Sequence, residues 1–462
     1  MVDKIRIPMY ESLITTKKRM KGSFHALPIQ NVNYDNETIL EEGFLLALEN
    51  ARKLELSITG PFFDSLSDPA RVIEESSNIM SDIYNSDLSL FVTCGSTIAN
   101  KIVIDGICKA GDKILCQSGV HQSIYFSLTN TCGDIDFITD VACDNDASLY
   151  RGNAEELLLS LKKNSYKTLI INSQTYDGVC FDLSKFLDEV CATSDSLENI
   201  IIDEAWGAWS TFASFMKEKS AVLNARRLTE KHEINFIVVH SMHKSLFSFR
   251  QSSLINVYGD ESCQSKIMSS HFKNHTTSPS YPILASTELA TIHASNFGYK
   301  YSERSLLLAN RLKTFIENSL TYFECQDIAI DSKYFFNDPT KVWISCDSSL
   351  YNGEKLRVHL FNNQGVYISR HSDDAILLNF HYGVTQGVLE ILKDGLRNIE
   401  KKIKLKNEIL NISIGDTSDS FFILYPPGIP VITPGQKVSE TEIVQIQQSQ
   451  LNNISLLVVE GN

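Results

Sequence analysis

Short apolar runs alternate with stretches of helical period along most of residues 88–259. Between the runs, in segments such as NAEELLLSLKKN and LSKFLDEVCATS, apolar residues recur at every third or fourth position, which is typical of amphipathic helices. This alternation predicts an α/β protein with one large, mostly parallel sheet and helices on both of its faces. Seven strands are expected, at residues 88–93, 112–117, 134–139, 166–172, 199–203, 234–240 and 252–259.

The pattern changes after TTSPSYPILAS (276–286). A long helical stretch comes first, and shorter strand-like runs such as KVWISC and AILLNFHYG follow it. A change of this kind is typical of a domain boundary, which we place near residue 295. We therefore predict an N-terminal segment (1–55), a large domain (56–295) and a smaller C-terminal α+β domain (296–462) that contains the Pro/Gly-rich segment YPPGIPVITPGQ and a following helix.

Composition excludes several classes of partner. The chain has 462 residues with 42 Lys+Arg against 56 Asp+Glu, and a formal charge of -14 disfavours nucleic acid and anionic membranes. No window is long and apolar enough for a membrane span, and the N-terminus lacks the apolar core of a secretory signal. The ten cysteines are isolated, which argues against a zinc or redox pair. We expect a cytoplasmic protein without bound metal.

Polar residues gather at the ends of the predicted strands, where open α/β sheets bind ligands. The first strand runs into VTCGSTIANK (92–101), which places a glycine and two hydroxyls at the start of a helix. Backbone N–H groups and the helix dipole there suit an anion. The Walker and dinucleotide patterns are both missing, so Gly95, Ser96 and Thr97 form either a phosphate site or an ordinary helix cap.

Asp203 and Lys244 each stand at the end of an apolar strand. Asp203 follows three isoleucines, where a carboxylate is costly unless a cation pairs with it. That cation is either a structural partner or the protonated ring nitrogen of a cofactor. Lys244, one strand away in VVHSMHK, is an amine that burial would hold at a lowered pKa, ready to form a Schiff base. An anion site, an apolar carboxylate and such a lysine together match what pyridoxal phosphate requires.

Other residues at the strand ends allow two interpretations each. His121 in SGVHQSIY would either stack on a cofactor ring or serve as a packing or capping residue. His240 and His243 suggest a metal site only weakly, because no carboxylate or third histidine stands at ligand spacing. Trp206 and Trp209 in DEAWGAW are also consistent with simple core aromatics.

Seven motifs taken together resemble one known family, the ornithine/lysine/arginine decarboxylases. The resemblance spans about residues 5 to 440 and corresponds to the shorter members that lack an N-terminal wing domain. It implies the aspartate-aminotransferase-like fold (fold type I) and pyridoxal 5'-phosphate as the cofactor. The motifs that carry it, in order, are FVTCGSTIANKIV, GVHQSIYFSL, QTYDGVCFDL, IIDEAWGAW, HSMHKSLFSFRQSSLINV, TTSPSYPILAS and YPPGIPVITPG.

The resemblance also implies roles for individual residues. Lys244 would form the imine with the cofactor, and Asp203 would pair with the pyridinium nitrogen. His121 would stack on one face of the ring and Ala205 would pack on the other, while Trp206 would approach the phenolic oxygen. The phosphate would be held by Gly95, Ser96, Thr97, Ser241 and His243.

Three departures from the family pattern fall mainly on substrate recognition. FHALPIQN (24–31) lacks the Gly-His-Lys that usually follows, and Met242 replaces a threonine. Many members carry Glu-Lys-Thr where this chain has Ser-Arg-His (369–371). A glutamate there would suit the distal cation of lysine or ornithine, so its loss removes a reason to expect those substrates. Arg370 is either a solvated surface charge or a clamp for a carboxylate or phosphate.

We therefore expect a lyase that releases carbon dioxide from an amino acid or an amino-acid conjugate and leaves an amine. The substrate's α-amine would displace Lys244 from the cofactor, and the cofactor would accept the electrons of the broken bond. The alternative is an aminotransferase, in which Lys244 would shuttle a proton and Arg370 would bind the α-carboxylate. A third possibility is a non-catalytic relative. The family resemblance implies a homodimer, or a higher homo-oligomer, with each subunit completing the other's active site.

Overall fold

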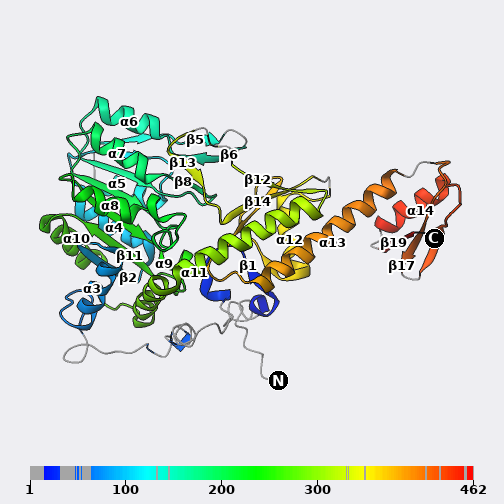
Figure 1. Ribbon diagram of the computed structural model, residues 1–462, viewed down its shortest axis with the longest axis horizontal. Coiled ribbons are helices and arrows are strands. Elements are labelled where there is room, and N and C mark those ends of the chain that lie inside the picture. Colours follow the sequence, from blue (N-terminus) through cyan, green and yellow to red (C-terminus); the bar gives the residue numbers. More distant parts are fainter. Residues whose placement is uncertain are drawn as a thin grey trace, which may run out of the picture.

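A computed structural model gives the fold, and Figure 1 shows its arrangement. The seven predicted strands form one sheet in the order β2-β11-β10-β9-β7-β3-β4. Every neighbouring pair is parallel except the two that involve β11, so the predicted mostly parallel sheet is confirmed. The strands are β2 (Leu88–Val92), β3 (Lys113–Gln117), β4 (Asp134–Ile138), β7 (Thr168–Asn172), β9 (Asn199–Asp203), β10 (Asn235–His240) and β11 (Ser253–Tyr258). The structure describes residues 15–31, 47, 49–50, 54, 64–131, 134–143, 146–328, 330, 332–347, 350–411, 414–425, 428–451 and 455–460.

Helices cover both faces of this sheet, which explains the long apolar strands. Side chains alternate between the faces along each strand. In β9, Ile201 packs in the core on one face, whereas Ile200 and Ile202 pack in the core on the other. The first face is covered by α4 (Gly95–Ile107), α5 (Gln122–Thr131) and α10 (Glu261–Asn274). The second face is covered by α3 (Val72–Tyr84), α6 (Ala154–Lys163), α7 (Leu183–Thr193) and α8 (Ala221–Thr229).

One long helix, α11 (Tyr281–Ser319), leads from this layered unit into the C-terminal part. Its first half contributes Ala290 and Ala294 to the core beneath the large sheet. Its second half contributes Leu308 and Leu312 to a separate core. The helix therefore passes without a break through residue 295, where the domain boundary is predicted.

The C-terminal part is a smaller α+β assembly. Its antiparallel sheet has the order β12-β14-β16, and the predicted strand runs KVWISC and AILLNFHYG contain β14 and β16. A parallel pairing between β1 and β15 ties the N-terminal residues to it. A second small sheet, β18-β17-β19, lies with α14 at the far end of α13 (Figure 1). The elements are β1 (Gly22–Ser23), β12 (Phe323–Gln326), β14 (Lys341–Cys346), α12 (Gly353–Gln364), β15 (Val366–Tyr367), β16 (Ala375–Asn379), α13 (Gln386–Asn411), β17 (Ser420–Tyr425), β18 (Ile429–Ile432), α14 (Glu440–Leu451) and β19 (Ser455–Glu460).

Short elements complete the fold. Strand β8 pairs with β13 and thereby joins the large unit to the smaller one. Within the described ranges, no helix has the combination of length and apolar character that crossing a membrane requires. These elements are η1 (Pro28–Asn31), β5 (Val141–Cys143), β6 (Asp146–Arg151), β8 (Val179–Phe181), η3 (Ser210–Phe212), η4 (Lys217–Lys219), α9 (Met242–Ser245) and β13 (Phe335–Asn337).

Candidate active site

Lys244 lies on α9, the single helical turn that follows β10. The turn is anchored because the backbone N–H of Met242 donates to the carbonyl of Ser252, with 3.1 Å between N and O. Burial lowers the pKa of Lys244; the negative charge of Asp203 opposes this shift and the positive charge of Lys341 adds to it. A lowered pKa increases the fraction of neutral amine, the form that attacks an aldehyde.

Asp203 ends β9, directly opposite Val239 of the neighbouring strand β10. The residue is 4% exposed, and its carboxylate accepts two hydrogen bonds: Oδ2 from Asn100 Nδ2 at 3.0 Å and Oδ1 from the backbone N of Ala205 at 3.0 Å. Among the residues described, no lysine, arginine or histidine nitrogen lies within 4.0 Å of its oxygens. A buried carboxylate held by neutral donors is suited to pair with a protonated heterocyclic nitrogen.

Gly95 begins α4, separated from the end of β2 by two residues, and adopts φ +79°, a conformation that favours glycine. Its backbone N donates to the carbonyl of Gln251 at 2.8 Å. Cys94 occupies the N-cap position, and no side chain caps this helix end. Ser96 and Thr97 follow in the first turn, partly buried and exposed respectively. An uncapped N-terminus flanked by two hydroxyls matches the requirements of a phosphate group.

Ser241 and His243 are linked to this helix end through Gln251 and Ser252, since Gly95 contacts Gln251 and His243 contacts Ser252. The Nδ1 atom of His243 is 3.1 Å from the carbonyl of Ser252 and 3.4 Å from Ser241 Oγ. Burial lowers the pKa of His243 to about 4, despite the hydrogen bond to Ser252, and the charges of Lys244 and Arg250 act in the same direction. The imidazole is therefore neutral near pH 7.

His121 follows β3 on the open side of the site. Its Nδ1 atom lies 2.9 Å from Ser123 Oγ, and the backbone N of Ser123 donates to it at 3.2 Å. Burial lowers the pKa of His121; the charge of Asp203 opposes this shift and the charge of Lys244 adds to it. The Ser123 hydroxyl also lies 3.2 Å from Asn100 Nδ2, which donates to Asp203. The predicted residues thus come from four segments, those of Gly95, His121, Asp203 and Lys244, which converge on one region, and Ser241 and His243 share the segment of Lys244.

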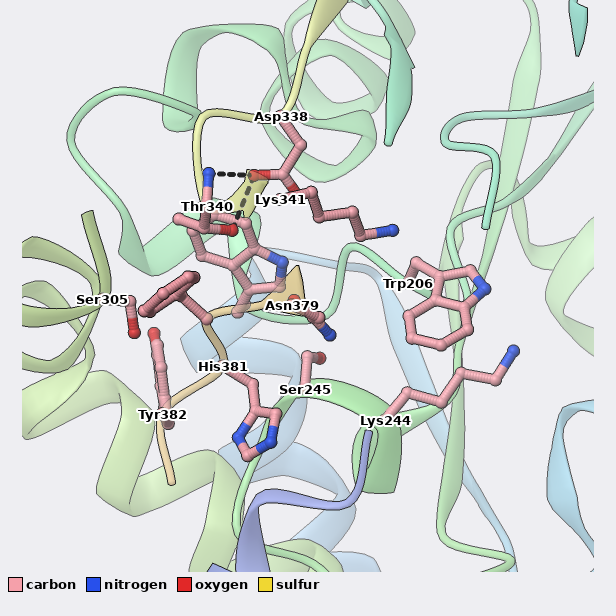
Figure 2. A pocket seen from close by; sticks show the side chains of 12 residues that line it. Trp206, Lys244, Ser245, Ser305, Asp338, Thr340, Lys341, Asn379, His381 and Tyr382 are labelled. Atoms are coloured by element: carbon pink, nitrogen blue, oxygen red, sulfur yellow. Dashed lines mark hydrogen bonds between the residues drawn. The ribbon is translucent and has the colours of Figure 1, made fainter. Parts of the chain in front are cut away.

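Trp206 connects this region to a cavity at the seam with the C-terminal part (Figure 2). The Nζ atoms of Lys244 and Lys341 each lie 4.7 Å from the centroid of its ring. His25 and Tyr176 lie near the same indole, with ring centroids 6.4 and 5.1 Å away, and His25 Nδ1 is 2.8 Å from the Tyr176 hydroxyl. The indole is thus contacted by segments far apart in sequence and forms a wall of the candidate site.

Arg370 forms a bidentate ion pair with Asp177. Its Nε donates to Oδ1 at 2.7 Å and its Nη2 to Oδ2 at 3.2 Å. Trp343 Nε1 donates to the backbone carbonyl of Asp177 at 3.2 Å, so two side chains of the C-terminal part hold the loop after β7. Two of the guanidinium nitrogens that a substrate carboxylate would use therefore contact Asp177.

His240 belongs to a buried network on the other side of the strand end. Its Nε2 atom lies 2.8 Å from Glu204 Oε2, and its Nδ1 is 3.3 Å from Asn256 Nδ2. Glu204 Oε1 also accepts from the backbone N of Ala221 at 3.0 Å. In the described part of the chain, no group of three or more His, Cys, Asp or Glu side chains is placed to hold a metal ion.

Comparison with known proteins identifies the family. The family model described as "Orn/Lys/Arg decarboxylase, major domain" matches residues 7–356. The chain belongs to the Orn/Lys/Arg decarboxylase family. It is 24% identical to an arginine decarboxylase of Bacillus subtilis over 432 residues, which cover 86% of this chain and 85% of that protein. It is 27% identical to the lysine decarboxylase LdcA of Pseudomonas aeruginosa over 258 residues, or 53% of this chain and 34% of that one.

Solved structures confirm the fold of this Orn/Lys/Arg decarboxylase family member. The lysine decarboxylase LdcF of Francisella novicida matches with a TM-score of 0.65 and 17% identity, over 97% of this chain and 81% of that one. A serine palmitoyltransferase of S. paucimobilis with bound PLP and myriocin matches with a TM-score of 0.53 and 13% identity, over 84% and 88%. The predicted fold type I and the predicted decarboxylase class are confirmed.

Sequence reasoning missed two residues of this family member's site. Asn100 stands one helical turn beyond Ser96 and Thr97, a spacing that places it on the same side of α4. That spacing was the available signal. Lys341 begins the apolar strand β14, and only the tertiary fold brings it to Trp206.

Proposed function

We propose that this chain is a pyridoxal-phosphate-dependent decarboxylase that removes the α-carboxyl group of an amino acid or an amino-acid conjugate. The observation that carries the proposal is the placement of Lys244 and Asp203 at the ends of adjacent strands β10 and β9. One is an amine whose pKa burial lowers, and the other is a buried carboxylate hydrogen-bonded only to neutral donors among the described residues. These are the two contacts that pyridoxal phosphate needs.

The donor set around them fits the rest of the cofactor. The uncapped start of α4 at Gly95, with Ser96 and Thr97, would hold the phosphate together with Ser241 and His243. His121 would cover one face of the ring and Ala205 the other, beside the indole of Trp206.

Each residue would then have a defined task. The bound cofactor supplies a cationic ring that accepts the electrons of the breaking carbon–carboxylate bond. Asp203 would keep the ring nitrogen protonated, because its negative charge favours the cation. Lys244 would hold the cofactor between turnovers and exchange with the substrate's amine. Partial burial of the site removes water that would compete for these contacts.

Transamination on the same residues is the nearest rival. That reaction usually retains the α-carboxylate, so a cation that binds this carboxylate would favour transamination. Arg370 is the candidate for that cation, but its Nε and Nη2 contact Asp177. This pairing favours decarboxylation.

The test is carbon dioxide release by purified protein supplied with pyridoxal phosphate and a pool of amino acids. We expect release that depends on the cofactor and is lost in Lys244→Ala, which should also lose the absorbance of covalently bound cofactor. A Lys244→Ala variant that keeps both would contradict the proposal. Replacing Lys185, an exposed lysine on α7, is the matched control and should change neither.

We also propose that the chain works in the cytoplasm as a homodimer. His121 and Thr97 are exposed in the single chain although they belong to the proposed cofactor site. A second subunit covering this side would exclude water from the site. Light scattering of the purified protein should give twice the mass of 51.9 kDa, and a monomer with full activity would contradict this part of the proposal.

A further inference from the structure

Arg250 is an exposed arginine on a tight turn between α9 and β11. The backbone N of Ser252 donates to the carbonyl of Phe249 at 3.2 Å, which closes the turn around Arg250 and Gln251. Gln251 has φ +71°, the positive value that type II turns require at their third residue and that usually selects glycine. A residue other than glycine is strained in this conformation, so the surrounding contacts must hold the turn in place.

Three helices fix this turn. The carbonyl of Gln251 accepts from the backbone N of Gly95 at 2.8 Å, and a β-carbon added to Gly95 would lie 3.9 Å from the Cα of Gln251. The carbonyl of Ser252 lies 3.1 Å from His243 Nδ1, and its hydroxyl lies 2.7 Å from that of Thr287 on α11. The turn therefore contacts both α4 and α9, which carry two of the residues proposed to hold the phosphate.

The residues proposed so far for the phosphate provide no full positive charge. Gly95, Ser96, Thr97 and Ser241 are neutral, and the start of α4 contributes only the partial charge of its dipole. The imidazole of His243 is neutral near pH 7, because burial lowers its pKa to about 4. A phosphate monoester carries a charge of about −1.5 to −2 at this pH. These residues alone would leave most of that charge uncompensated.

The guanidinium of Arg250 is a cation without a partner in the single chain. Among the described residues, no carboxylate oxygen lies within 4.0 Å of its nitrogens and no hydrogen bond involves its side chain. Other exposed arginines of this chain are paired, as Arg397 is with Asp394 at 2.7 Å. The charge of Arg250 also lowers the pKa of His243. Arginine presents a planar fork of N–H donors that suits phosphate oxygens.

We propose that Arg250 binds the phosphate of the cofactor and supplies the positive charge that the other proposed ligands lack. The inference rests on the proposed function and adds a cofactor-binding residue to it. The guanidinium would replace water around the phosphate with charge-assisted hydrogen bonds. The strained turn would hold Arg250 beside the start of α4 before the cofactor arrives, which reduces the entropy lost on binding.

The test compares pyridoxal phosphate with pyridoxal, which has the same aldehyde and ring but no phosphate. Full-length protein freed of cofactor is titrated with each compound, and the absorbance of the imine with Lys244 gives the two dissociation constants. We expect Arg250→Gln to weaken pyridoxal phosphate by about tenfold, the lower end for hydrogen bonds to charged groups, because the guanidinium is exposed in the single chain. Binding of pyridoxal should change by less than about twofold, since it lacks the group that Arg250 binds.

Two further variants serve as controls. Arg250→Lys keeps the charge but not the planar fork, so it should weaken pyridoxal phosphate less than Arg250→Gln does. Arg397 lies on α13 with its side chain 47% exposed, and Arg397→Gln should bind both compounds as the unchanged protein does. Retained binding of pyridoxal shows that Arg250→Gln is folded, and Arg250→Ala provides the same comparison if it is not.

Two results would overturn this inference alone: unchanged affinity of Arg250→Gln for pyridoxal phosphate, or equal weakening of the two compounds in that variant. The first would assign Arg250 to a substrate anion or a subunit contact. The second would show that it only supports the fold of the turn. Absence of imine absorbance with either compound in the unchanged protein would instead overturn the proposed function, and this inference with it.

Discussion

The side-chain amide of Asn100 donates a hydrogen bond to the carboxylate of Asp203, with 3.0 Å between Nδ2 and Oδ2. The same Nδ2 also lies 3.2 Å from Ser123 Oγ, which in turn is 2.9 Å from His121 Nδ1. One buried amide therefore links the proposed partner of the ring nitrogen to the residue proposed to cover the ring. The geometry of the site depends on this amide as well as on the residues that would touch the cofactor.

Removing the amide should impair turnover more than cofactor binding. In Asn100→Ala the carboxylate of Asp203 loses one of its two neutral donors, and we expect kcat to fall about tenfold. Asp203→Ala should lower kcat further, by about 10²- to 10³-fold, because it removes the charge itself. Steady-state rates and cofactor affinity measured together check this. Asn100→Ala with unchanged kcat would contradict the positioning role.

The buried pair of Glu204 and His240 should contribute strongly to stability. Replacing Glu204 with Ala leaves the His240 Nε2 and the backbone N of Ala221 without their acceptor in the core. We expect a loss of about 3–5 kcal/mol in the free energy of unfolding, measured with urea. Glu204→Gln keeps the size and one acceptor oxygen, and it should cost much less. Equal losses in the two variants would show that hydrogen bonding is not the cause.

The pairing of Arg370 with Asp177 predicts energetic coupling between the C-terminal part and the loop after β7. In a double-mutant cycle of Arg370→Ala and Asp177→Ala, we expect the stability losses to be non-additive by at least about 0.5 kcal/mol. The bidentate geometry and the low exposure of Asp177, 14% for its side chain, are the reasons. Additive losses, with an increase in KM confined to Arg370→Ala, would favour a substrate-binding role for the arginine instead.

Lowering the pH should destabilise the fold, because the buried imidazole of His271 takes up a proton when the chain unfolds. This imidazole is 4% exposed, its Nε2 lies 2.9 Å from the carbonyl of Phe91, and burial lowers its pKa to about 4. The unfolded chain takes up the proton near the ordinary pKa of 6.5, so the stabilisation is complete above pH 6.5 and is lost as the pH falls toward 4. At pH 5 this single group lowers the free energy of unfolding by about 2 kcal/mol relative to its value above pH 6.5.

Urea unfolding at pH 7.5 and pH 5 measures this effect. In His271→Gln, the difference between the free energies of unfolding at the two pH values should shrink by about 2 kcal/mol. It should not change in His232→Gln, because His232 is exposed. An unaltered pH dependence in His271→Gln would contradict the assignment.

Local pattern was sufficient to predict the large sheet and the residues at its strand ends. Apolar runs identify β9 and β10; Asp203 ends the first run and Lys244 lies on the turn just after the second, at the edge where open α/β sheets bind ligands, which is why both could be proposed as site residues. The domain boundary was harder to predict, because α11 continues through residue 295 and contributes apolar residues to two cores.

Contacts between distant segments could not be predicted. Asp177 and Arg370 are 193 residues apart, and nothing in either local sequence indicates the pairing. Lys341 likewise reads as an ordinary charged residue at the start of a strand. Its burial beside Trp206 follows from how the C-terminal sheet packs against the large unit, and such packing leaves no periodic signal.

Product analysis in deuterated water tests the central claim most directly. The protein is incubated with pyridoxal phosphate and a pool of acidic, neutral and basic amino acids, and mass spectrometry searches for new amines and oxo acids. Decarboxylation at this site predicts an amine with one deuterium on its α-carbon, absent from Lys244→Ala reactions. An oxo acid formed without such an amine would contradict the account and assign the chain to transamination.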